Sequence, residues 1–575
     1  MELENKIKKL KGLVSDHETT EFLTFLAGVL LQMPQRHENP FLKNLMSPMR
    51  QLFFLGLLNL NRSSTKDKKG FNEKEWDEIA SLLHGIEMEY FFLLGFPKQG
   101  KETKEEIEKI RVTMPTFMNY FFNGPLAYQE QEIERIEKVF LDFEPQIIQT
   151  YGVSLSDFVA FYDLVNEAID KNLNFAVKFL NKDTWQEFTT KCIDKGLLDP
   201  KDWINEAPEE MMAFLNFTRN PGSFLILDLD KLDYSMLARE KLEKIINYFT
   251  CSSNPTNEIA YYTEDNELIK KPFFKISDTE YLPFYLKQYL DSCYNFLFSK
   301  CIEFNKDKAL KCRDDYVEQK TERIFKNFLK NEGHFYTNYS IDNGTSEQDL
   351  LILYNGNAIV IEVKASSYRA PMRDANKAFD KLKSDFKKSI QYGYEQTSRV
   401  IKAFKITDKL PILDSKKKLL YEIPTKRYTT YSIIVTLERF GHIQTNLDEM
   451  LQLDDTENYP WCVNIDDLEA FLLTLSKEKN KFNSFLTFLQ YREKYHGHLV
   501  CSDELELCGS FLTDGKEFCL RSLKEETIVT LADLTEPIEK SYREGMGFDN
   551  ERKWERKKNN DAIFLYYDTK TNSSC

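Results

Sequence analysis

The amino-acid sequence predicts a multidomain α+β protein, in which mostly α-helical N- and C-terminal regions flank an α/β core with a mixed sheet. The chain has 575 residues, which is enough for about three or four domains. Apolar residues recur at intervals of three and four in the first part of the chain and again near its end, a spacing typical of helices. Between these regions, two apolar, β-branched runs lie on either side of an Asn-Gly pair, a strong local signal for a β-hairpin.

The N-terminal region, residues 1–270, is predicted to consist mainly of helices. Phe22, Leu26 and Leu30 define one apolar helical face, and Ile133–Phe143 carries another. This region contains no motif that indicates a chemistry, so we assign it only to recognition or assembly. Residues 271–309 are expected to connect it to the next domain through a hairpin and a helix.

Residues 310–445 are predicted to form a compact α/β unit, because an opening helix is followed by two strands, a long helix and another strand. The opening helix is expected to end near Gly333, since glycine is favoured just beyond a helix C-terminus. The later elements are expected at Asp349–Tyr354, Ala358–Val363, Ala375–Lys405 and Thr430–Leu437. Residues 446–575 are predicted to be mostly helical, with a polar tail that contains Arg552, Lys553, Arg556, Lys557 and Lys558.

The net charge of the chain is −15, which argues against a general affinity for nucleic acids. The segment from Lys364 to Arg427 differs, because its 17 basic and 7 acidic residues leave a net charge of +10. Such a run is usually a solvated helix face, but it can also follow a phosphate backbone. The apolar stretches are too short to span a bilayer and the charged start lacks the apolar segment of a signal peptide, so we expect a cytoplasmic protein with no membrane partner.

Ten cysteines are spread along the chain without a CxxC pair, as expected of reduced thiols in a cytoplasmic protein. One cluster of metal-ligand residue types comprises His496, His498, Cys501 and Cys508. Its spacing matches no common zinc site. We therefore favour ordinary packing over a structural zinc ion there.

The Asn-Gly pair sets the register of the predicted hairpin. With Asn355 and Gly356 as the central residues of a type I′ turn, Asp349 lies directly opposite Glu362, and their Cβ atoms are expected about 4.5–5.5 Å apart. Lys364 shares this face of the sheet because strand side chains alternate. A turn shifted by one residue would place Asp349 opposite Lys364 instead. Either register gathers two carboxylates and one ammonium on a small patch.

Two carboxylates this close repel each other unless positive charge lies between them. Lys364 supplies part of that charge, and a hard divalent cation such as Mg²⁺ or Mn²⁺ would supply more because it prefers oxygen ligands. A water on such an ion loses a proton more readily, which is the chemistry that cleaves phosphodiester bonds. The simpler interpretation is a structural ion pair on a half-buried strand.

The hairpin residues resemble a known family. Asp349, followed after a strand and a turn by Glu362-Val363-Lys364 in the context IVIEVKA, is similar to the motif of the PD-(D/E)XK nuclease superfamily. Its members include restriction endonucleases, archaeal Holliday-junction resolvases and phage-defence nucleases. The resemblance covers about residues 312–440 and implies a restriction-endonuclease-like core. This sequence departs from the motif in one place, where Gln348 precedes the aspartate instead of proline.

The resemblance implies a Mg²⁺-dependent endodeoxyribonuclease, with RNA as an alternative substrate and phage defence as its setting. Asp349 and Glu362 would hold the metal together with the Val363 carbonyl, and Lys364 would position or activate the water. The opening helix often brings a further carboxylate in this family, for which Glu322 is the candidate. Glu318, one turn earlier, also lies at the edge of the core stripe. Three further expectations concern Gln396 and Gln391 as alternative glutamines at the site, Ser366–Arg369 as a phosphate contact, and the basic residues between Arg369 and Arg427 as the DNA track.

Other functions fit parts of the sequence. A nuclease fold can bind nucleic acid without cutting it, although such proteins commonly lack one of the three charged residues that are present here. A helical scaffold or sensor protein in a defence complex is the other alternative. A homodimer or protein partners from such a complex would fit either of these functions. The chain contains no P-loop, GxxxxGK[ST], and so shows no ATP motor.

Overall fold

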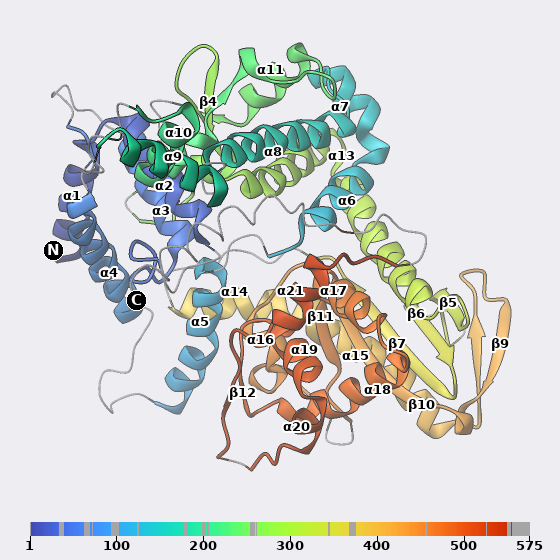
Figure 1. Cartoon of the computed structure of the whole chain (residues 1–575). Helices are drawn as coiled ribbons and strands as arrows, with labels where there is room; N and C mark the ends of the chain where they lie inside the picture. The colour runs from blue at the N-terminus through green and yellow to red at the C-terminus, as the bar shows by residue number, and fades with distance from the viewer. Residues whose placement is uncertain are drawn as a thin grey trace. The chain divides into compact units, whose positions relative to one another are not determined.

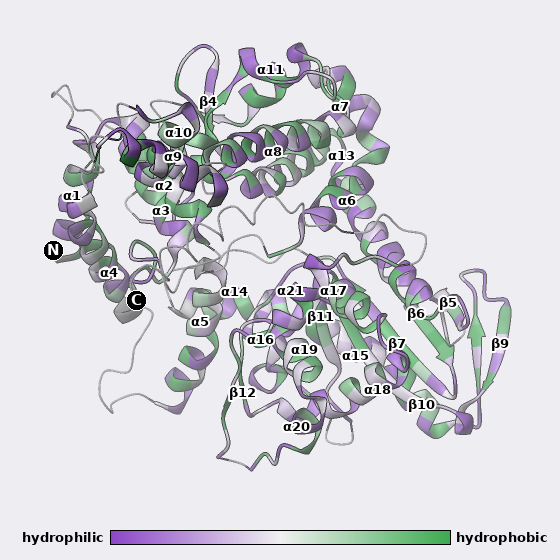
Figure 2. Cartoon of the chain, viewed as in Figure 1, coloured by the Kyte–Doolittle hydropathy of each residue, from purple (hydrophilic) through white to green (hydrophobic). Residues whose placement is uncertain are grey.

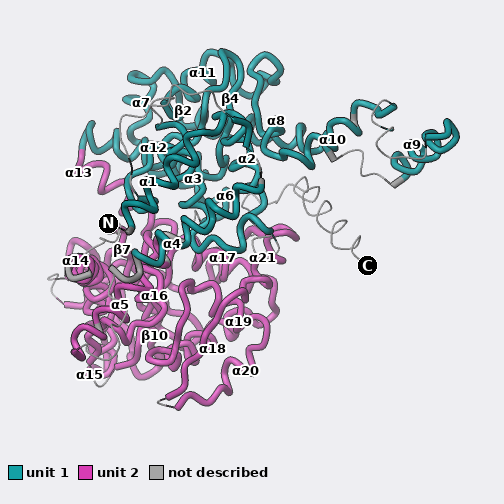
Figure 3. Tube along the Cα trace, turned by 90° about the vertical axis from the view of Figure 1, so that its left-hand side faces the viewer, with its two compact units in different colours: residues 1–89, 121–305, 557–575 teal, residues 90–120, 306–556 magenta. Residues whose placement is uncertain are grey.

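The computed structural model describes residues 2–33, 39–61, 69–71, 73–93, 103–122, 126–177, 182–197, 203, 206–252, 259, 261–342, 346–366, 375–454, 457–524, 526–548 and 554 (Figure 1). The chain is an α+β protein with helical N- and C-terminal regions and mixed sheets, as predicted. It divides into two compact units, drawn in teal and magenta in Figure 3. The first unit contains residues 1–89 and 121–305, and the second contains residues 90–120 and 306–556.

The first unit is built from helices around one small sheet. Its sheet has the order β1-β4-β3-β2, and β3 and β4 form the hairpin expected between residues 271 and 282. Helix α2 lies so close to residue Gly222 that an added Cβ there would be 1.7 Å from the Thr24 carbonyl oxygen. Only glycine therefore allows this approach. The elements are α1 (Glu2–Ser15), α2 (Thr19–Leu31), α3 (Pro48–Leu60), α4 (Trp76–Leu93), α6 (Gln129–Val139), α7 (Glu144–Tyr151), α8 (Leu155–Val177), α9 (Lys182–Asp194), α10 (Glu209–Arg219), β1 (Leu227–Asp228), α11 (Arg239–Tyr248), β2 (Thr250–Cys251), α12 (Glu267–Lys270), β3 (Phe273–Lys275) and β4 (Glu280–Pro283).

The element α13 (Leu286–Phe328) passes from the first unit into the second. It contains a break at Asn305, whose φ of −161° and ψ of 101° are extended rather than helical. The two helices predicted from the sequence before and after residue 310 correspond to the two parts of α13. The break also coincides with the boundary between the units, so the part after Asn305 belongs to the second unit.

The second unit contains a five-stranded mixed sheet with the order β11-β10-β7-β6-β5. Strands β7, β10 and β11 run parallel, whereas β5, β6 and β7 are joined antiparallel. Figure 2 shows green, hydrophobic stretches along this sheet, which is the composition that burial on both faces requires. The strands are β5 (His334–Tyr339), β6 (Gln348–Tyr354), β7 (Asn357–Lys364), β10 (Thr429–Thr436) and β11 (Trp461–Asn464).

The turn between β6 and β7 has the predicted form. Asn355 and Gly356 both have positive φ, at 46° and 72°, as a type I′ turn requires. Tyr354 pairs with Asn357, and the pairing continues to Leu350 opposite Ile361. The register with Asn355 and Gly356 at the centre is therefore confirmed, and the register shifted by one residue is excluded.

A helical segment covers the face of the sheet that carries the hairpin's charged residues. The sequence predicts one helix at Ala375–Lys405, but the structure divides it into α14 (Ala375–Phe386), a π-helical turn at Lys387–Gln391 and α15 (Tyr392–Ile406). Val400 of α15 packs with Leu351 and Val360 of the hairpin. Because strand side chains alternate, Asp349 and Glu362 extend the same face beyond this apolar cluster. Strands β8 (Lys409–Leu413) and β9 (Leu419–Pro424) form a separate hairpin.

The second unit also includes a helix from early in the chain. In α5 (Lys104–Phe122), Val112 belongs to an apolar cluster with Leu382 and Phe386 of α14. Arg111 forms an ion pair with Glu449 at 3.0 Å. Residues 103–120 thus lie with the second unit, whereas the sequence grouped them with the N-terminal region.

The C-terminal region is mostly helical and completes the sheet with β11. Among the described residues, no helix is long and apolar enough to cross a membrane. The elements are α16 (His442–Thr445), α17 (Ile465–Leu475), α18 (Lys481–Arg492), β12 (Leu499–Val500), α19 (Glu504–Thr513), α20 (Gly515–Leu520), β13 (Val529–Thr530) and α21 (Glu536–Arg543).

The turn makes a testable contribution to stability. Gly356→Ala should lower the free energy of unfolding by about 1–2 kcal/mol, because an L-residue at this positive φ is strained. Gly515→Ala is the matched control, since its added Cβ would lie 3.5 Å from the Phe511 ring in ordinary contact. Urea unfolding of the full-length protein measures both. Equal effects of the two substitutions would contradict the assignment of the turn.

Candidate active site

The hairpin brings Asp349, near the start of β6, together with Glu362, near the end of β7. The backbone N–H of Asp349 donates to Oε1 of Glu362 at 3.3 Å. The backbone N–H of Val363 donates to Oδ2 of Asp349 at 2.7 Å. Each carboxylate thus bonds to the opposite strand, so the register that pairs the strands also fixes the two side chains.

Lys364 lies against both carboxylates. Its Nζ is 2.9 Å from Oε2 of Glu362 and 3.5 Å from Oδ2 of Asp349. The side chains of Asp349, Glu362 and Lys364 are 17%, 0% and 12% exposed. The three groups therefore form one partly buried cluster with two negative charges and one positive charge when all are ionised.

Burial and repulsion change the proton affinity of this cluster. The pKa of Glu362 is raised to about 8, first because burial disfavours the charged carboxylate and second because Asp349 is negative. The ammonium of Lys364 opposes this shift without cancelling it. Burial alone would lower the pKa of Lys364, but the two carboxylates together raise it. Without a further cation, Lys364 is charged at neutral pH and Glu362 tends to keep its proton.

Helix α13 contributes another carboxyl beside the cluster. The pKa of Glu318 is raised to about 7, first by burial and then by the charge of Asp349. Glu322, the ligand suggested from the sequence, forms an ion pair with Lys326 at 2.6 Å on the same helix. The negative charge of Asp349 thus raises the pKa of Glu318, which lies one helical turn before Glu322. Both lie at the edge of the helix's core stripe, and the sequence alone could not choose between them.

The two candidate glutamines have different surroundings. Gln396 is buried, its Nε2 is 3.5 Å from the carbonyl oxygen of Glu347, and its Oε1 has no hydrogen-bond partner among the described residues. It therefore lies beside the start of β6, where Asp349 follows. Gln391 instead accepts from the backbone N–H of Gln452 at 2.9 Å and donates to the carbonyl of the same residue at 3.4 Å. Its hydrogen bonds tie down the loop that leads to β11.

Two polar residues near the carboxylates had no role assigned from the sequence. Tyr339, the last residue of β5, is fully buried and its hydroxyl has no hydrogen-bond partner among the described residues. Its pKa is raised well above the usual value, first by burial and then by Glu362 and Asp349, so the hydroxyl remains a donor. Gln348 is also fully buried, and its Oε1 is likewise unpaired. The strand β5 has no regular alternation of apolar residues, so no sequence signal placed Tyr339 here.

Only part of the predicted basic track is available to a ligand. Lys383, Lys387 and Lys388 are exposed on α14 and the π-helical turn. Other basic residues have acidic neighbours, as in the pairs Lys402–Asp454 at 3.0 Å and Lys409–Glu422 at 2.9 Å. Ser366 forms a hydrogen bond with Ser389 of the π-helical turn. The predicted contacts at residues 367–369 and the basic tail at residues 552–558 lie outside the described residues, except for position 554.

The His and Cys cluster near residue 500 is occupied by ordinary hydrogen bonds. The Nδ1 atom of His496 accepts from the backbone N–H of Leu447 at 3.0 Å, and the Cys501 thiol donates to the Asp503 carbonyl at 3.0 Å. Burial raises the pKa of the Cys501 and Cys508 thiols, which disfavours the thiolate that zinc requires. Within the ranges described, no group of three or more His, Cys, Asp or Glu residues is arranged to hold a metal ion. The hydrogen bonds of His496 and Cys501 are those of ordinary packing, the interpretation favoured from the sequence.

The hairpin carboxylates fit a different kind of ion. They form a pair rather than a group of three, and Mg²⁺ is typically held by one or two carboxylates while it keeps several waters. Burial and the negative charge of Asp349 raise the pKa of Glu362, and a divalent cation between the carboxylates would oppose this shift. The donor set, carboxylate oxygens on adjacent strands, suits a hard cation.

The raised pKa of Glu362 predicts a pH dependence for the metal-free protein. An unfolded chain releases this proton near the usual value of 4.5, whereas the folded protein keeps it until about pH 8. The proton on Glu362 therefore makes its full contribution to the free energy of unfolding below pH 4.5. This contribution is lost as the pH rises towards 8. Glu362→Gln should flatten this loss, so that the variant gains stability relative to wild type between about pH 5 and pH 8. Urea unfolding in EDTA across this range measures the difference, and parallel pH profiles would contradict the assignment.

Part of the second unit is similar to a known protein family. Residues 313–429 match the family model of the nuclease-related domain. The matched segment begins within α13 and ends at the start of β10, so it includes Glu318, Asp349, Glu362 and Lys364. No curated protein and no solved structure matches the chain. The second unit therefore contains a segment similar to the nuclease-related domain, and the clustered charged residues lie within that segment.

Proposed function

We propose that the chain is a metal-dependent nuclease that hydrolyses phosphodiester bonds, with DNA as its substrate. The observation that carries this proposal is the cluster of Asp349, Glu362 and Lys364, whose charged groups meet within 2.9–3.5 Å at one end of the sheet in a nuclease-related domain. The resemblance to the PD-(D/E)XK superfamily supports the assignment of each role. Its phage-defence members extend the proposal to antiviral defence.

The metal site would be formed by the two carboxylates and a backbone carbonyl. Asp349 and Glu362 would hold Mg²⁺ or Mn²⁺ together with the carbonyl of Val363. A bound ion supplies positive charge to the phosphate and makes a water easier to deprotonate. The hydrogen bonds from the Val363 and Asp349 amides orient the carboxylates before any ion binds. The free energy needed to orient the carboxylates is thus supplied by folding, and no reorientation is needed during the reaction.

Lys364 and Glu318 have separate roles in this proposal. The Lys364 ammonium keeps its charge because two carboxylates surround it, and it can donate to an attacking water or to a phosphate oxygen. Glu318 has a pKa near 7, so its carboxyl can accept and release a proton at neutral pH. We therefore assign Glu318 as the carboxyl of α13 that serves the site. Gln396 and Tyr339 would bond to water or phosphate through polar atoms that have no partner in the described chain.

Cleavage should require the divalent cation and all three charged residues. Wild-type protein should cut DNA with Mg²⁺ or Mn²⁺ and not with EDTA, and Lys364→Ala should reduce the rate by about 10²–10⁴-fold. DNA binding should change little in this variant, because one ammonium is a small part of the basic surface. Lys409→Ala is the matched control, since this lysine is paired with Glu422 on the separate hairpin. The readout is cleavage of a labelled oligonucleotide.

Two further results separate the alternatives in the same experiment. Asp349→Asn should abolish cleavage and also remove the stabilisation by Mn²⁺, which amounts to about 2.7 kcal/mol at 100 times the dissociation constant. Binding without cleavage by the wild type would indicate a silent binding module. Absence of both would indicate a scaffold or sensor protein.

The exposed lysines of α14 and the π-helical turn should carry the salt dependence of DNA binding. Replacing Lys383, Lys387 and Lys388 with alanine should weaken binding to duplex DNA and reduce the slope of log K against log salt by about 0.9 for each lost phosphate contact. The control replaces three exposed lysines of the turn between β8 and β9, namely Lys416, Lys417 and Lys418. Binding is measured with Ca²⁺ in place of Mg²⁺ to keep the DNA intact. If the control variant loses more affinity for DNA than the test variant, the DNA binds along the β8–β9 hairpin instead.

A further inference from the structure

An exposed aromatic side chain lies at the catalytic lysine. Tyr392 is the first residue of α15, and 51% of its surface is exposed. The Nζ atom of Lys364 is 5.6 Å from the centre of its ring. A single exposed aromatic residue is ordinary on a protein surface. This one is distinguished by its position beside the ammonium that would face the phosphate.

The π-helical turn and the following glycine account for this position. A π-turn inserts one extra residue, which rotates all later side chains by about 100° around the helix. At the next residue, Gly393, an added Cβ would be 3.1 Å from Ile434 and 3.5 Å from Cε of Lys364. The backbone of α15 therefore lies directly against Ile434 of β10 and against the side chain of Lys364. Tyr392 lies beside this contact and remains accessible to solvent.

The neighbouring charges suit a nucleic-acid strand. Lys387 and Lys388 are exposed in the turn that immediately precedes Tyr392. Basic side chains hold a phosphate backbone, while an aromatic ring beside them offers a surface on which a base can stack. In a duplex the faces of each base are covered by its neighbours, so only an unstacked base can occupy such a ring. Stacking accepts any base, because every base has a π-face.

We propose that Tyr392 stacks on an unpaired base next to the scissile phosphate, which makes single-stranded or locally unpaired nucleic acid the preferred substrate. This inference rests on the nuclease function proposed above. In this proposal, Tyr392 makes the enzyme prefer unpaired over duplex nucleic acid. It requires no particular base sequence. In this arrangement the phosphate lies at Lys364 and the adjoining base lies over the Tyr392 ring.

The test compares single-stranded and duplex DNA of the same sequence. Wild-type protein should cut the single strand faster, and Tyr392→Ala should slow this reaction by about 5-fold to 150-fold, which corresponds to ~1–3 kcal/mol of stacking. Cleavage of the duplex should be unchanged. Tyr392→Phe should behave as wild type because it keeps the ring. Tyr421→Ala is the matched control, since Tyr421 is 44% exposed on β9, where it stacks on Tyr336.

An abasic nucleotide beside the scissile phosphate gives a second, independent measurement. It should reduce the wild-type rate by the same factor as Tyr392→Ala, and it should have little further effect on that variant, because both changes remove one contact. An equal loss by Tyr392→Ala on single strand and duplex would overturn the proposal and show that the ring acts through Lys364. Faster wild-type cleavage of the duplex would also overturn it.

The affinity for DNA tests the stacking contact separately from the chemistry. With Ca²⁺ in place of Mg²⁺, Tyr392→Ala should bind the single strand about 5-fold to 150-fold more weakly and the duplex equally well. Unchanged single-strand affinity would contradict stacking even if cleavage fell. Absence of cleavage by the wild type on every substrate would instead contradict the proposed nuclease function, while the binding comparison would still decide the role of Tyr392.

Discussion

The burial of the Glu362 carboxyl beside Asp349 is the constraint around which the second unit is organised. Glu362 has no exposed surface, and a carboxylate there is costly unless hydrogen bonds and positive charge offset the loss of water. The hairpin supplies both, through the amide of Asp349 and the ammonium of Lys364. If β6 slipped by one residue against β7, Asp349 would lie opposite Val363 and Glu362 would point to the other face of the sheet. The turn therefore sets the register, and the register in turn places the charged cluster.

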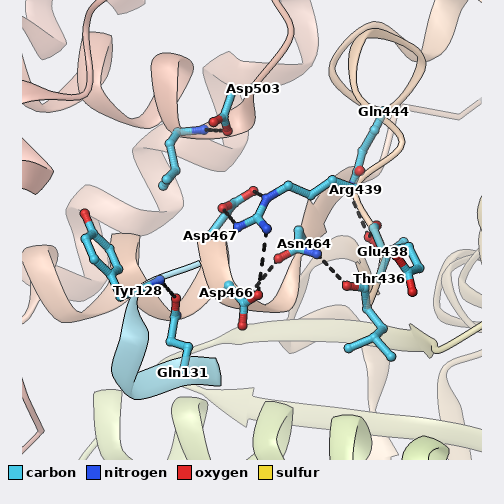
Figure 4. A network of polar contacts seen from close by, with 12 residues as sticks. Tyr128, Gln131, Thr436, Glu438, Arg439, Gln444, Asn464, Asp466, Asp467 and Asp503 are labelled. Carbon is cyan, nitrogen blue, oxygen red and sulfur yellow. Dashed lines mark hydrogen bonds and ion pairs between the residues drawn. The ribbon is translucent and has the colours of Figure 1, made fainter. Parts of the chain in front are cut away.

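The C-terminal region supports the strand next to this cluster. Thr436 pairs with Lys364 across β10 and β7, and its hydroxyl accepts from Gln444 at 3.0 Å. Beyond it, the partly buried Arg439 donates to the buried carboxylate of Asp467 at 2.6 Å at the start of α17 (Figure 4). Buried ion pairs contribute little net stability, but they allow few alternative arrangements. The helices after β10 thus fix the end of the sheet at which the charged residues lie.

The sequence was sufficient for the parts that local rules determine. An Asn-Gly turn fixes a register by itself, so the juxtaposition of Asp349, Glu362 and Lys364 could be worked out by pairing residues outward from it. Strand β11 has four residues and begins at Trp461, too short to show alternation. The choice between Glu318 and Glu322 depended on how α13 lies against the sheet, and helical spacing does not give that. The π-helical turn has no sequence signal of its own, so the position of Tyr392 could be seen only in the structure.

The placement of α5 has a consequence for the order in which this chain can fold. Its residue Val112 is synthesised long before Leu382 and Phe386, the residues it packs against. During synthesis, the apolar face of α5 therefore stays exposed until α14 has been made. In that interval the face can bind chaperones or aggregate. Contacts so distant in sequence also slow folding, because a long loop must close first. The two units are interleaved in sequence, so neither can be released by a single cut in the chain.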